Sequence, residues 1–179
     1  AILLCRIDNF RMNINIFSRI CVIIILVNSL FDDVDQAGDC LSQIGDWHDP
    51  YPDPLVEIHQ GVHVVRDDML AAGTKVRGVD YLIGHDARFA HIEEWVYGSC
   101  PAAGYAQISL PTVCGRYQKR AVIFMAKRRL DALHPYQQRG LDAGADVHWV
   151  PNGMLSVTQA RARAYVAESP TTRMLLPMG

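Results

Sequence analysis

Short apolar runs alternate with helix-sized segments through the second half of the chain, and this alternation constrains the fold most strongly. The runs of strand length are Trp95–Tyr97, Ala121–Ala126, Val147–Val150 and Met174–Leu176. Strands that alternate with helices of about ten to fifteen residues indicate βαβ units. Right-handed crossovers then place helices on both faces of a parallel sheet. The sequence therefore predicts an α/β fold, a three-layer parallel sheet with helices on both faces.

The helices expected between these strands span about Ala103–Tyr117, Pro135–Gly144 and Ser156–Glu168. Pro111 disturbs the first helix, because proline has no backbone N–H. Gly144 closes the second helix as a glycine just past its end. Ser156 and Gln159 have the spacing of a capping box, which predicts that Ser156 opens the third helix.

Composition narrows the class of protein. At 179 residues the chain is long enough for one domain with a proper core. Its formal net charge of -2 gives no indication of nucleic-acid binding. The five cysteines are scattered without a C-x-x-C pair, which fits free thiols in a reducing compartment. We therefore expect a cytoplasmic protein without a nucleic-acid partner, in which Cys100 is a buried or inert thiol.

The sequence predicts an irregular amino-terminal segment of uncertain origin, residues 1–54, before an α/β domain, residues 55–179. The segment contains an apolar run, Ile16–Leu30, that is unbroken from Cys21 to Val27. A basic start and a short apolar middle resemble an export signal. The run lacks a clean cleavage site and is short for a bilayer span. Its β-branched residues favour a buried strand, and we expect no membrane partner. The acidic, turn-rich stretch Phe31–Pro54 should be irregular and exposed.

The main candidate for chemistry lies in the stretch Gly61–Arg77. Val62–Val65 is predicted to be a short strand, and Gly73 allows a sharp turn before Thr74, an acceptable helix N-cap. Lys75 then opens a helix at a strand end, where open α/β sheets bind ligands. The helix dipole disfavours a cation there, so a neutral amine that can attack a carbonyl is easier to reach. The competing interpretation is a surface lysine in an ordinary turn.

Other polar residues give weaker indications. Arg77 is expected to orient the loop or to pair with Asp67 or Asp68, and each acid taken singly is typical of a solvated strand end. His91 and Glu93 have the H-x-E spacing of zinc deaminases. The cysteine motif that should follow lacks its second cysteine, so no metal site is expected.

The segments RDD…GTKVR and VYGSCPAAGYAQ resemble pyridoxal-phosphate-dependent enzymes of tryptophan-synthase-β-like fold. They are most similar to the group of 1-aminocyclopropane-1-carboxylate deaminase and D-cysteine desulfhydrase. That group carries an acidic pair after a strand, then Gly-Gly-Asn-Lys-x-Arg, then a glycine-rich strand-to-helix loop. The resemblance covers about Pro54–Gly179 and implies the front part of this fold.

The resemblance also implies a cofactor, pyridoxal phosphate, and a small amino-acid substrate in a deaminase or lyase reaction. The lysine of the motif falls on Lys75, which is implied as the Schiff-base lysine and general base. The implied cofactor-binding residues are Lys75, Thr74, Ala103 and Gly104. The implied substrate-binding residues are Ser99, Ala102 and Tyr105.

The chain departs from the family pattern at three places. Ala72-Gly73-Thr74 stands where the family has Gly-Gly-Asn, and Ala102-Ala103 stands where it has Ser-Asn. The sequence stops at Gly179, about where the second domain of the family begins, so we expect the front part of a longer enzyme. Two alternatives remain open: a Rossmann-like domain that binds a small anion, and a non-catalytic remnant that folds with a partner, for example as a homodimer.

Overall fold

The computed structural model describes residues 4–5, 45, 47–127, 133–151 and 154–176. The chain divides into two compact units, residues 1–81 and residues 82–179. The apolar run Ile16–Leu30 and most of the acidic stretch Phe31–Pro54 lie outside the described residues, so the predictions made for them stay predictions. No described helix is both long and apolar enough to cross a membrane.

A parallel sheet forms the centre of the unit at residues 82–179. Its strands are β4 (Glu94–Tyr97), β5 (Arg120–Ala126), β6 (Asp146–Val150) and β7 (Arg173–Leu175). They are ordered β6-β5-β4-β7, and every neighbouring pair is parallel. The four apolar runs of the sequence correspond to these four strands. The predicted parallel α/β sheet is therefore confirmed.

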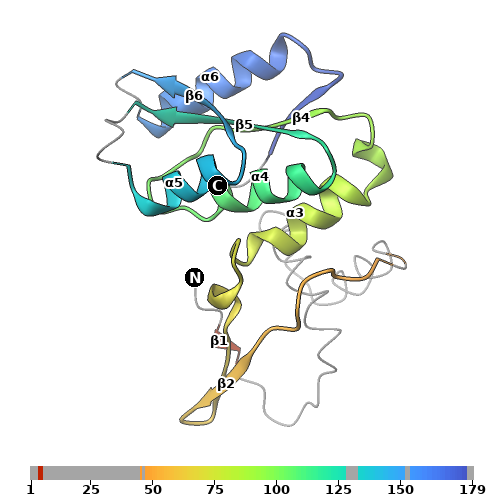
Figure 1. The fold of residues 1–179 in the computed structure, drawn as a ribbon, viewed down its shortest axis with the longest axis vertical. Coiled ribbons are helices and arrows are strands. Elements are labelled where there is room, and N and C mark those ends of the chain that lie inside the picture. The colour runs from red at the N-terminus through yellow and green to blue at the C-terminus, as the bar shows by residue number, and fades with distance from the viewer. Residues whose placement is uncertain (1–3, 6–44, 46, 128–132, 152–153, 177–179) are drawn as a thin grey trace. The chain divides into compact units, whose positions relative to one another are not determined.

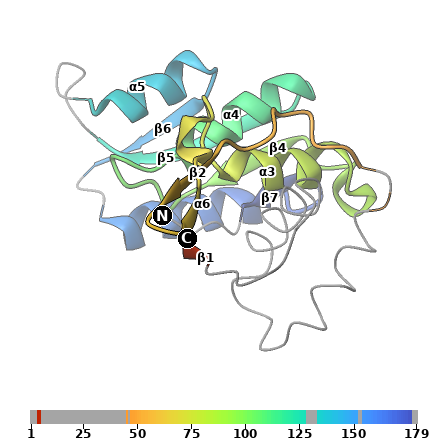
Figure 2. The same cartoon turned by 90° about the horizontal axis from the view of Figure 1, so that it is seen from below.

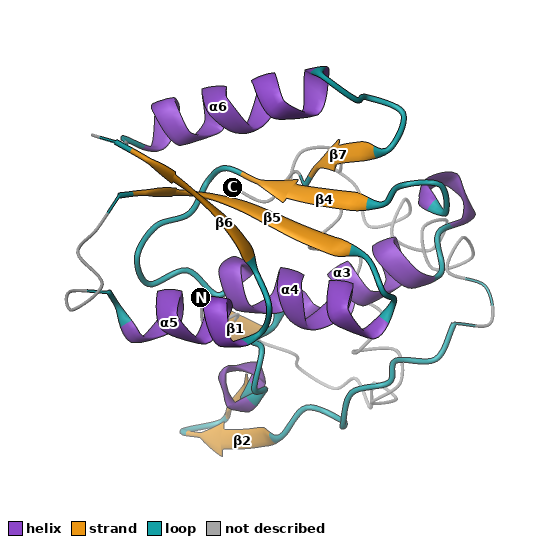
Figure 3. Ribbon diagram, turned by 45° about the horizontal axis from the view of Figure 1, so that its top comes forward, coloured by secondary structure: helices purple, strands orange, loops and turns teal. Residues whose placement is uncertain are grey.

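Helices cover both faces of this sheet. They are α4 (Ala106–Arg116), α5 (Pro135–Asp142) and α6 (Leu155–Ala167), with a short 3-10 turn, η2 (Ala87–Phe89), before β4. Figures 1 and 3 show α4 and α5 together on one face and α6 alone on the other. The view in Figure 2 separates the same two layers. The arrangement is thus helix, sheet, helix.

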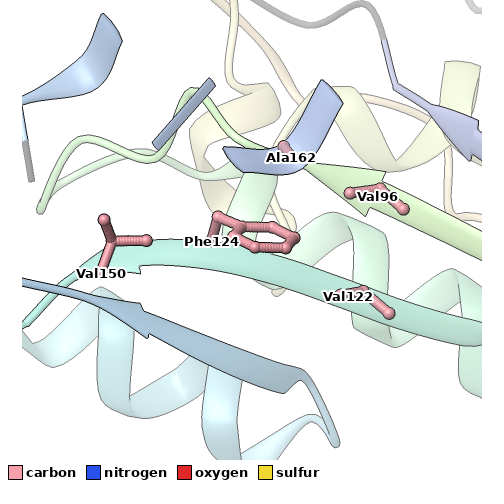
Figure 4. Close-up of a cluster of buried hydrophobic side chains, with 5 residues drawn as sticks. All are labelled: Val96, Val122, Phe124, Val150 and Ala162. Atoms are coloured by element: carbon pink, nitrogen blue, oxygen red, sulfur yellow. The ribbon is translucent and has the colours of Figure 1, made fainter. Parts of the chain in front are cut away.

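The core of this unit is buried on both sides of the sheet. Val122 and Phe124 of β5 join Val96, Val150 and Ala162 in one cluster, against which part of α6 packs (Figure 4). The alternate residues of β5, Ala121, Ile123 and Met125, are buried as well. Since successive strand side chains point to opposite faces, a strand buried at every position must be covered on both sides.

Helix α4 begins at Ala106, three residues later than predicted. A turn precedes it, in which the Gly104 N–H donates to the Pro101 carbonyl at 3.2 Å. Pro111 lies inside the helix and lacks the N–H that would bond the Gln107 carbonyl four residues earlier. Gly140 of α5 packs against the Gln107 carbonyl. A Cβ on Gly140 would lie only 2.5 Å from that carbonyl oxygen. The absent side chain lets α5 approach α4.

The predicted end of α5 is confirmed, and the predicted cap of α6 is wrong. Helix α5 begins at Pro135 with His134 as its N-cap, and Gly144, at φ +91°, lies just past its end as expected. Helix α6 begins at Leu155 with Met154 as its N-cap and no side-chain capping bond. The predicted capping box at Ser156 is therefore wrong.

The unit at residues 1–81 contains a small antiparallel sheet ordered β1-β3-β2. Its strands are β1 (Leu4–Cys5), β2 (Val56–His59) and β3 (Val62–Val65), followed by a 3-10 turn, η1 (Asp67–Met69), and helix α3 (Lys75–Gly84). Gln60 and Gly61 connect β2 to β3 with φ values of 52° and 81°, as a two-residue type I′ hairpin turn requires.

This hairpin differs from the predicted parallel sheet. Val62–Val65 is a strand, as predicted, but it pairs in antiparallel fashion with β2 rather than entering the parallel sheet. The reason is local: a two-residue turn can join only antiparallel neighbours, whereas a parallel pair needs a crossover. The strand before Lys75 is thus a hairpin strand.

Candidate functional site

Lys75 is the first residue of α3 and follows a turn that glycine makes possible. Gly73 has φ +74°, a conformation that side-chain-bearing residues rarely adopt. The Val76 N–H donates to the Gly73 carbonyl at 3.1 Å, which starts the helix directly after the turn. The Lys75 side chain is half-buried, and burial lowers the pKa of its amine. Because burial disfavours the charged form, the neutral amine is more highly populated than that of an exposed lysine. The sequence predicted the same direction from the helix dipole.

A buried charge cluster lies two residues beyond Lys75. Arg77 is only 1% exposed, and its guanidinium bonds the Asp49 carboxylate and, at 2.7 Å, the Pro52 carbonyl. The same guanidinium lies 3.5 Å from an Asp67 carboxylate oxygen. These contacts connect the segment before β2 and the turn after β3 to the first turn of α3.

The two acids of the RDD triplet have different environments. Asp67 is buried, and burial raises the pKa of its carboxyl although Arg77 opposes the shift. Asp68 is exposed and accepts two hydrogen bonds of 2.9 Å from Arg66, which lowers the pKa of the Asp68 carboxyl. The prediction that each acid is solvated at a strand end is therefore wrong for Asp67 and correct for Asp68. Of the two partners predicted for Arg77, the structure selects Asp67.

In the other unit, the loop Gly98–Tyr105 follows β4 at the carboxyl edge of the parallel sheet. From β4 the chain passes through α4 to β5, which lies on one side of β4. From β6 it passes through α6 to β7, which lies on the opposite side of β4. This reversal is a topological switch point, and ligands of open α/β sheets bind there. The loop is thus in the position that the fold favours for a ligand.

Helix α6 holds one end of this loop. The Thr158 hydroxyl donates to the Gly98 carbonyl at 2.7 Å, and the Gln159 amide donates to the Ser99 hydroxyl at 2.5 Å. A Cβ on Gly98 would lie 2.7 Å from that of Ala162, so only glycine permits this approach. Gln159, which the sequence suggested as part of a helix cap, therefore fixes the loop instead, together with Thr158.

Gln107 of α4 holds the middle of the loop. Its amide donates to the Ala102 carbonyl at 2.8 Å and accepts from the Cys100 thiol at 2.6 Å. Burial raises the pKa of the Cys100 thiol to about 12, so the reactive thiolate is scarce at neutral pH. The expected inert thiol fits this environment.

The remaining loop residues offer mainly backbone groups. Ala102 and Ala103 are exposed and have methyl side chains, so they can offer a ligand only backbone polar groups. Gly104 and Tyr105 are half-buried, and the Tyr105 hydroxyl accepts a 3.1 Å hydrogen bond from Tyr136. The helix N-terminus that the sequence placed at Ala103 lies slightly further along, after Tyr105.

The predicted site residues thus form two sets. Thr74 and Lys75 lie together in the unit at residues 1–81, and Ser99 to Tyr105 lie together in the unit at residues 82–179. Sequence reasoning missed Asp49, Gln107, Thr158 and Gln159, which hold these sets in place. A polar glutamine within an apolar helix was the one usable signal, since buried polar side chains need partners.

The described residues contain no cluster of three or more His, Cys, Asp or Glu side chains that could hold a metal ion. Comparison of the sequence with protein-family models gives no match, and none of the curated proteins matches it. The resemblance noted from the two motifs therefore remains a hypothesis.

Proposed function

We propose that the protein is a pyridoxal-phosphate-dependent enzyme of deaminase or lyase type that acts on a small amino acid. The observation that carries the proposal is the half-buried Lys75 amine at the start of α3, whose pKa burial lowers. A lysine in this state is suited to attack an aldehyde. The resemblance of the surrounding RDD…GTKVR motif to such enzymes supports the same assignment.

The residues fit this cofactor in part. Lys75 would hold it covalently and then accept or donate a proton. The resemblance adds Thr74 and the backbone at Ala103 and Gly104 as further cofactor-binding groups. When bound, pyridoxal phosphate supplies an electron-accepting ring that stabilises charge at the substrate α-carbon.

The substrate carboxylate would bind the backbone N–H groups at the start of α4, because helix N-termini favour anions. The side chains assigned to the substrate are Ser99 and Tyr105, with Ala102 contributing backbone only. Their hydroxyls already have the neighbours Gln159 and Tyr136, which would orient them. We place the enzyme in the cytoplasm, where the Cys100 and Cys114 thiols stay reduced.

A labelling experiment tests the assignment to Lys75. The sequence has three lysines, Lys75, Lys119 and Lys127, so a modified peptide identifies its lysine unambiguously. The full chain is incubated with a small excess of pyridoxal phosphate, reduced with borohydride and digested. We expect the label on Lys75, since its amine has the lowered pKa.

The other lysines are internal controls. Lys119 donates to the Ala90 and Ile92 carbonyls at 2.8 and 2.6 Å, which engages its amine, and Lys127 is exposed. Lys75→Met should abolish the visible absorption band of the complex, whereas Lys127→Met should leave it unchanged. Labelling that is equal at Lys75 and Lys127 would show ordinary surface chemistry and reject the proposal.

The fixed loop at the switch point favours a second candidate, a domain that binds a small anion without chemistry. Its support is the loop Gly98–Tyr105, held by Thr158, Gln159 and Gln107 before a helix N-terminus. In that case phosphate or a small carboxylate should raise the melting temperature. Ala103→Asp, which puts a negative charge beside the site, should remove the effect, and pyridoxal phosphate should label no lysine selectively.

A further inference from the structure

Among the described residues, the outer edge of β2 is an unpaired sheet edge. In the part of the chain that the structure describes, β2 pairs with β3 on one side and with no strand on the other (Figure 1). Natural edge strands are blunted by short length, by charged side chains, especially lysine, by proline or by a bulge. Strand β2 is short and carries one carboxylate, Glu57, but it lacks the other devices. The four residues of β2, Val-Glu-Ile-His, contain neither lysine nor proline, and they pair with β3 one to one without a bulge.

The side chains at this edge are apolar on one face. Ile58 is 65% exposed and Val56 is 41% exposed, and both project from the same face because strand side chains alternate. When another strand covers an exposed isoleucine on an edge strand, apolar surface is removed from water and the free energy falls. The edge therefore has both backbone groups and apolar side chains to offer.

The hairpin decides which backbone groups point outward. His59 and Val62 flank the two-residue turn, so they form its closing hydrogen-bonded pair. Bonded pairs recur at every second residue, and the Arg66 N–H donates to the Leu55 carbonyl at 2.7 Å in the same series. The N–H and C=O groups of Val56 and Ile58 consequently face the free edge.

From this geometry we infer that β2 pairs with β2 of a second copy of the chain, antiparallel, about a twofold axis at Ile58. In this register Ile58 exchanges both of its backbone hydrogen bonds with the partner's Ile58. Glu57 then lies directly opposite the partner's His59, and His59 opposite the partner's Glu57. A carboxylate can accept a hydrogen bond from the imidazole that lies opposite it, and a twofold interface forms each pair twice.

The neighbouring register is disfavoured by charge. A twofold axis at Glu57 also brings outward-facing backbone groups together, but it places two Glu57 carboxylates opposite each other. Registers with an axis between residues oppose outward-facing groups to inward-facing ones and form no ladder. Within one chain Glu57 already bonds His59 at 2.9 Å and Arg66 at 2.8 Å, so the side chains are held on the face where the pairing needs them.

The contact is small, and this sets its strength. Four residues a side bury far less than the roughly 1,200 Å² of a stable interface. We expect a weak dimer, detectable by sedimentation velocity of the full chain at high micromolar concentration. Ile58→Lys should weaken it on the order of tenfold, because two ammonium groups would meet at the axis. Met154→Lys is the matched control, since Met154, the N-cap of α6, is 72% exposed, and it should leave the dimer unchanged.

A charge exchange tests the register. His59→Glu should weaken self-association, because it sets carboxylates opposite carboxylates. Mixing this variant with a Glu57→Lys chain should restore dimers, since the carboxylate introduced at position 59 then lies opposite the ammonium introduced at position 57, while Glu57 of the first chain lies opposite His59 of the second. Circular dichroism of each variant checks that the hairpin survives.

Cysteine trapping gives an answer that does not depend on these charges. Residues opposite each other in a bonded antiparallel pair lie about 5.5 Å apart at Cα, within disulfide range. Ile58→Cys should therefore cross-link readily, while Glu57→Cys and the parent chain should not. No self-association near millimolar concentration would overturn the inference. So would equal effects of Ile58→Lys and Met154→Lys, or cross-linking that is stronger through Glu57→Cys.

Discussion

At the scale of single residues, the buried position of Asp67 disfavours the charged form of its carboxyl. Its pKa is raised above the ordinary 3.8, so the folded chain holds this proton more tightly than the unfolded chain does. The free energy of unfolding must then fall as pH rises above about 3.8, and the loss remains at neutral pH. We expect Asp67→Asn to be at least as stable as the parent at pH 7, with a flatter pH dependence in urea unfolding.

Asp68 is the control of opposite sign. Arg66 lowers the pKa of the Asp68 carboxyl, so this group adds stability above its ordinary pKa, and that stability is lost as pH falls through the lowered pKa. Asp68→Asn should therefore lose a little stability at pH 7. If both variants shift the stability curve in the same direction, the buried state assigned to Asp67 is wrong.

Arg77 is the single residue on which the charge cluster depends. Arg77→Met removes the counter-charge of Asp49 and Asp67 and leaves the Pro52 carbonyl without its donor. Breaking a buried ion pair from one side costs about 3–5 kcal/mol, which urea denaturation should show. Arg120→Met breaks the pairs of an exposed arginine with Glu94 and Asp146, and Glu94 keeps Arg173 as a partner, so this variant should cost about 1 kcal/mol or less. Similar losses in both variants would contradict the cluster.

At the scale of elements, the approach of α6 to the end of β4 depends on Gly98. A Cβ there would lie 2.9 Å from the Gln159 Cα and 3.0 Å from the Thr158 carbonyl oxygen, and neither backbone atom can move alone. We expect Gly98→Ala to cost about 1–3 kcal/mol in thermal or urea unfolding. Gly115→Ala, in α4 with open space around it, should instead stabilise by about 0.5–1 kcal/mol. A neutral Gly98→Ala would show that the loop is not fixed by α6.

Which elements the sequence could predict follows from how local their causes are. The strands β4 and β5 are apolar runs buried on both faces, and β6 and β7 are short, mostly half-buried apolar runs at the edges of the sheet. The composition of these runs identifies them. The α5 ends depend on His134, Pro135 and Gly144, which act within a few residues. The start of α6 was predicted to within one residue, but its capping box was wrong because the Gln159 side chain, like that of Thr158, bonds a residue about sixty positions away, which no local pattern reveals. The sheet of β3 was missed because the turn at Gln60 lacks a strong signature such as Asn-Gly.

At the scale of the whole molecule, the unit at residues 82–179 has its own core, since Val96, Val122, Phe124, Val150 and Ala162 all belong to it. About 95 residues with a sheet covered on both faces is enough for an independent domain. We expect residues 85–179, which begin after α3, to fold alone and to unfold in one cooperative urea transition, with a slope near 1 kcal/mol per molar urea. Near-ultraviolet circular dichroism of the buried Trp95 should report the same transition. A sloping, non-cooperative curve would mean that the core depends on residues before position 85 and that the division into two units does not describe how the chain is stabilised.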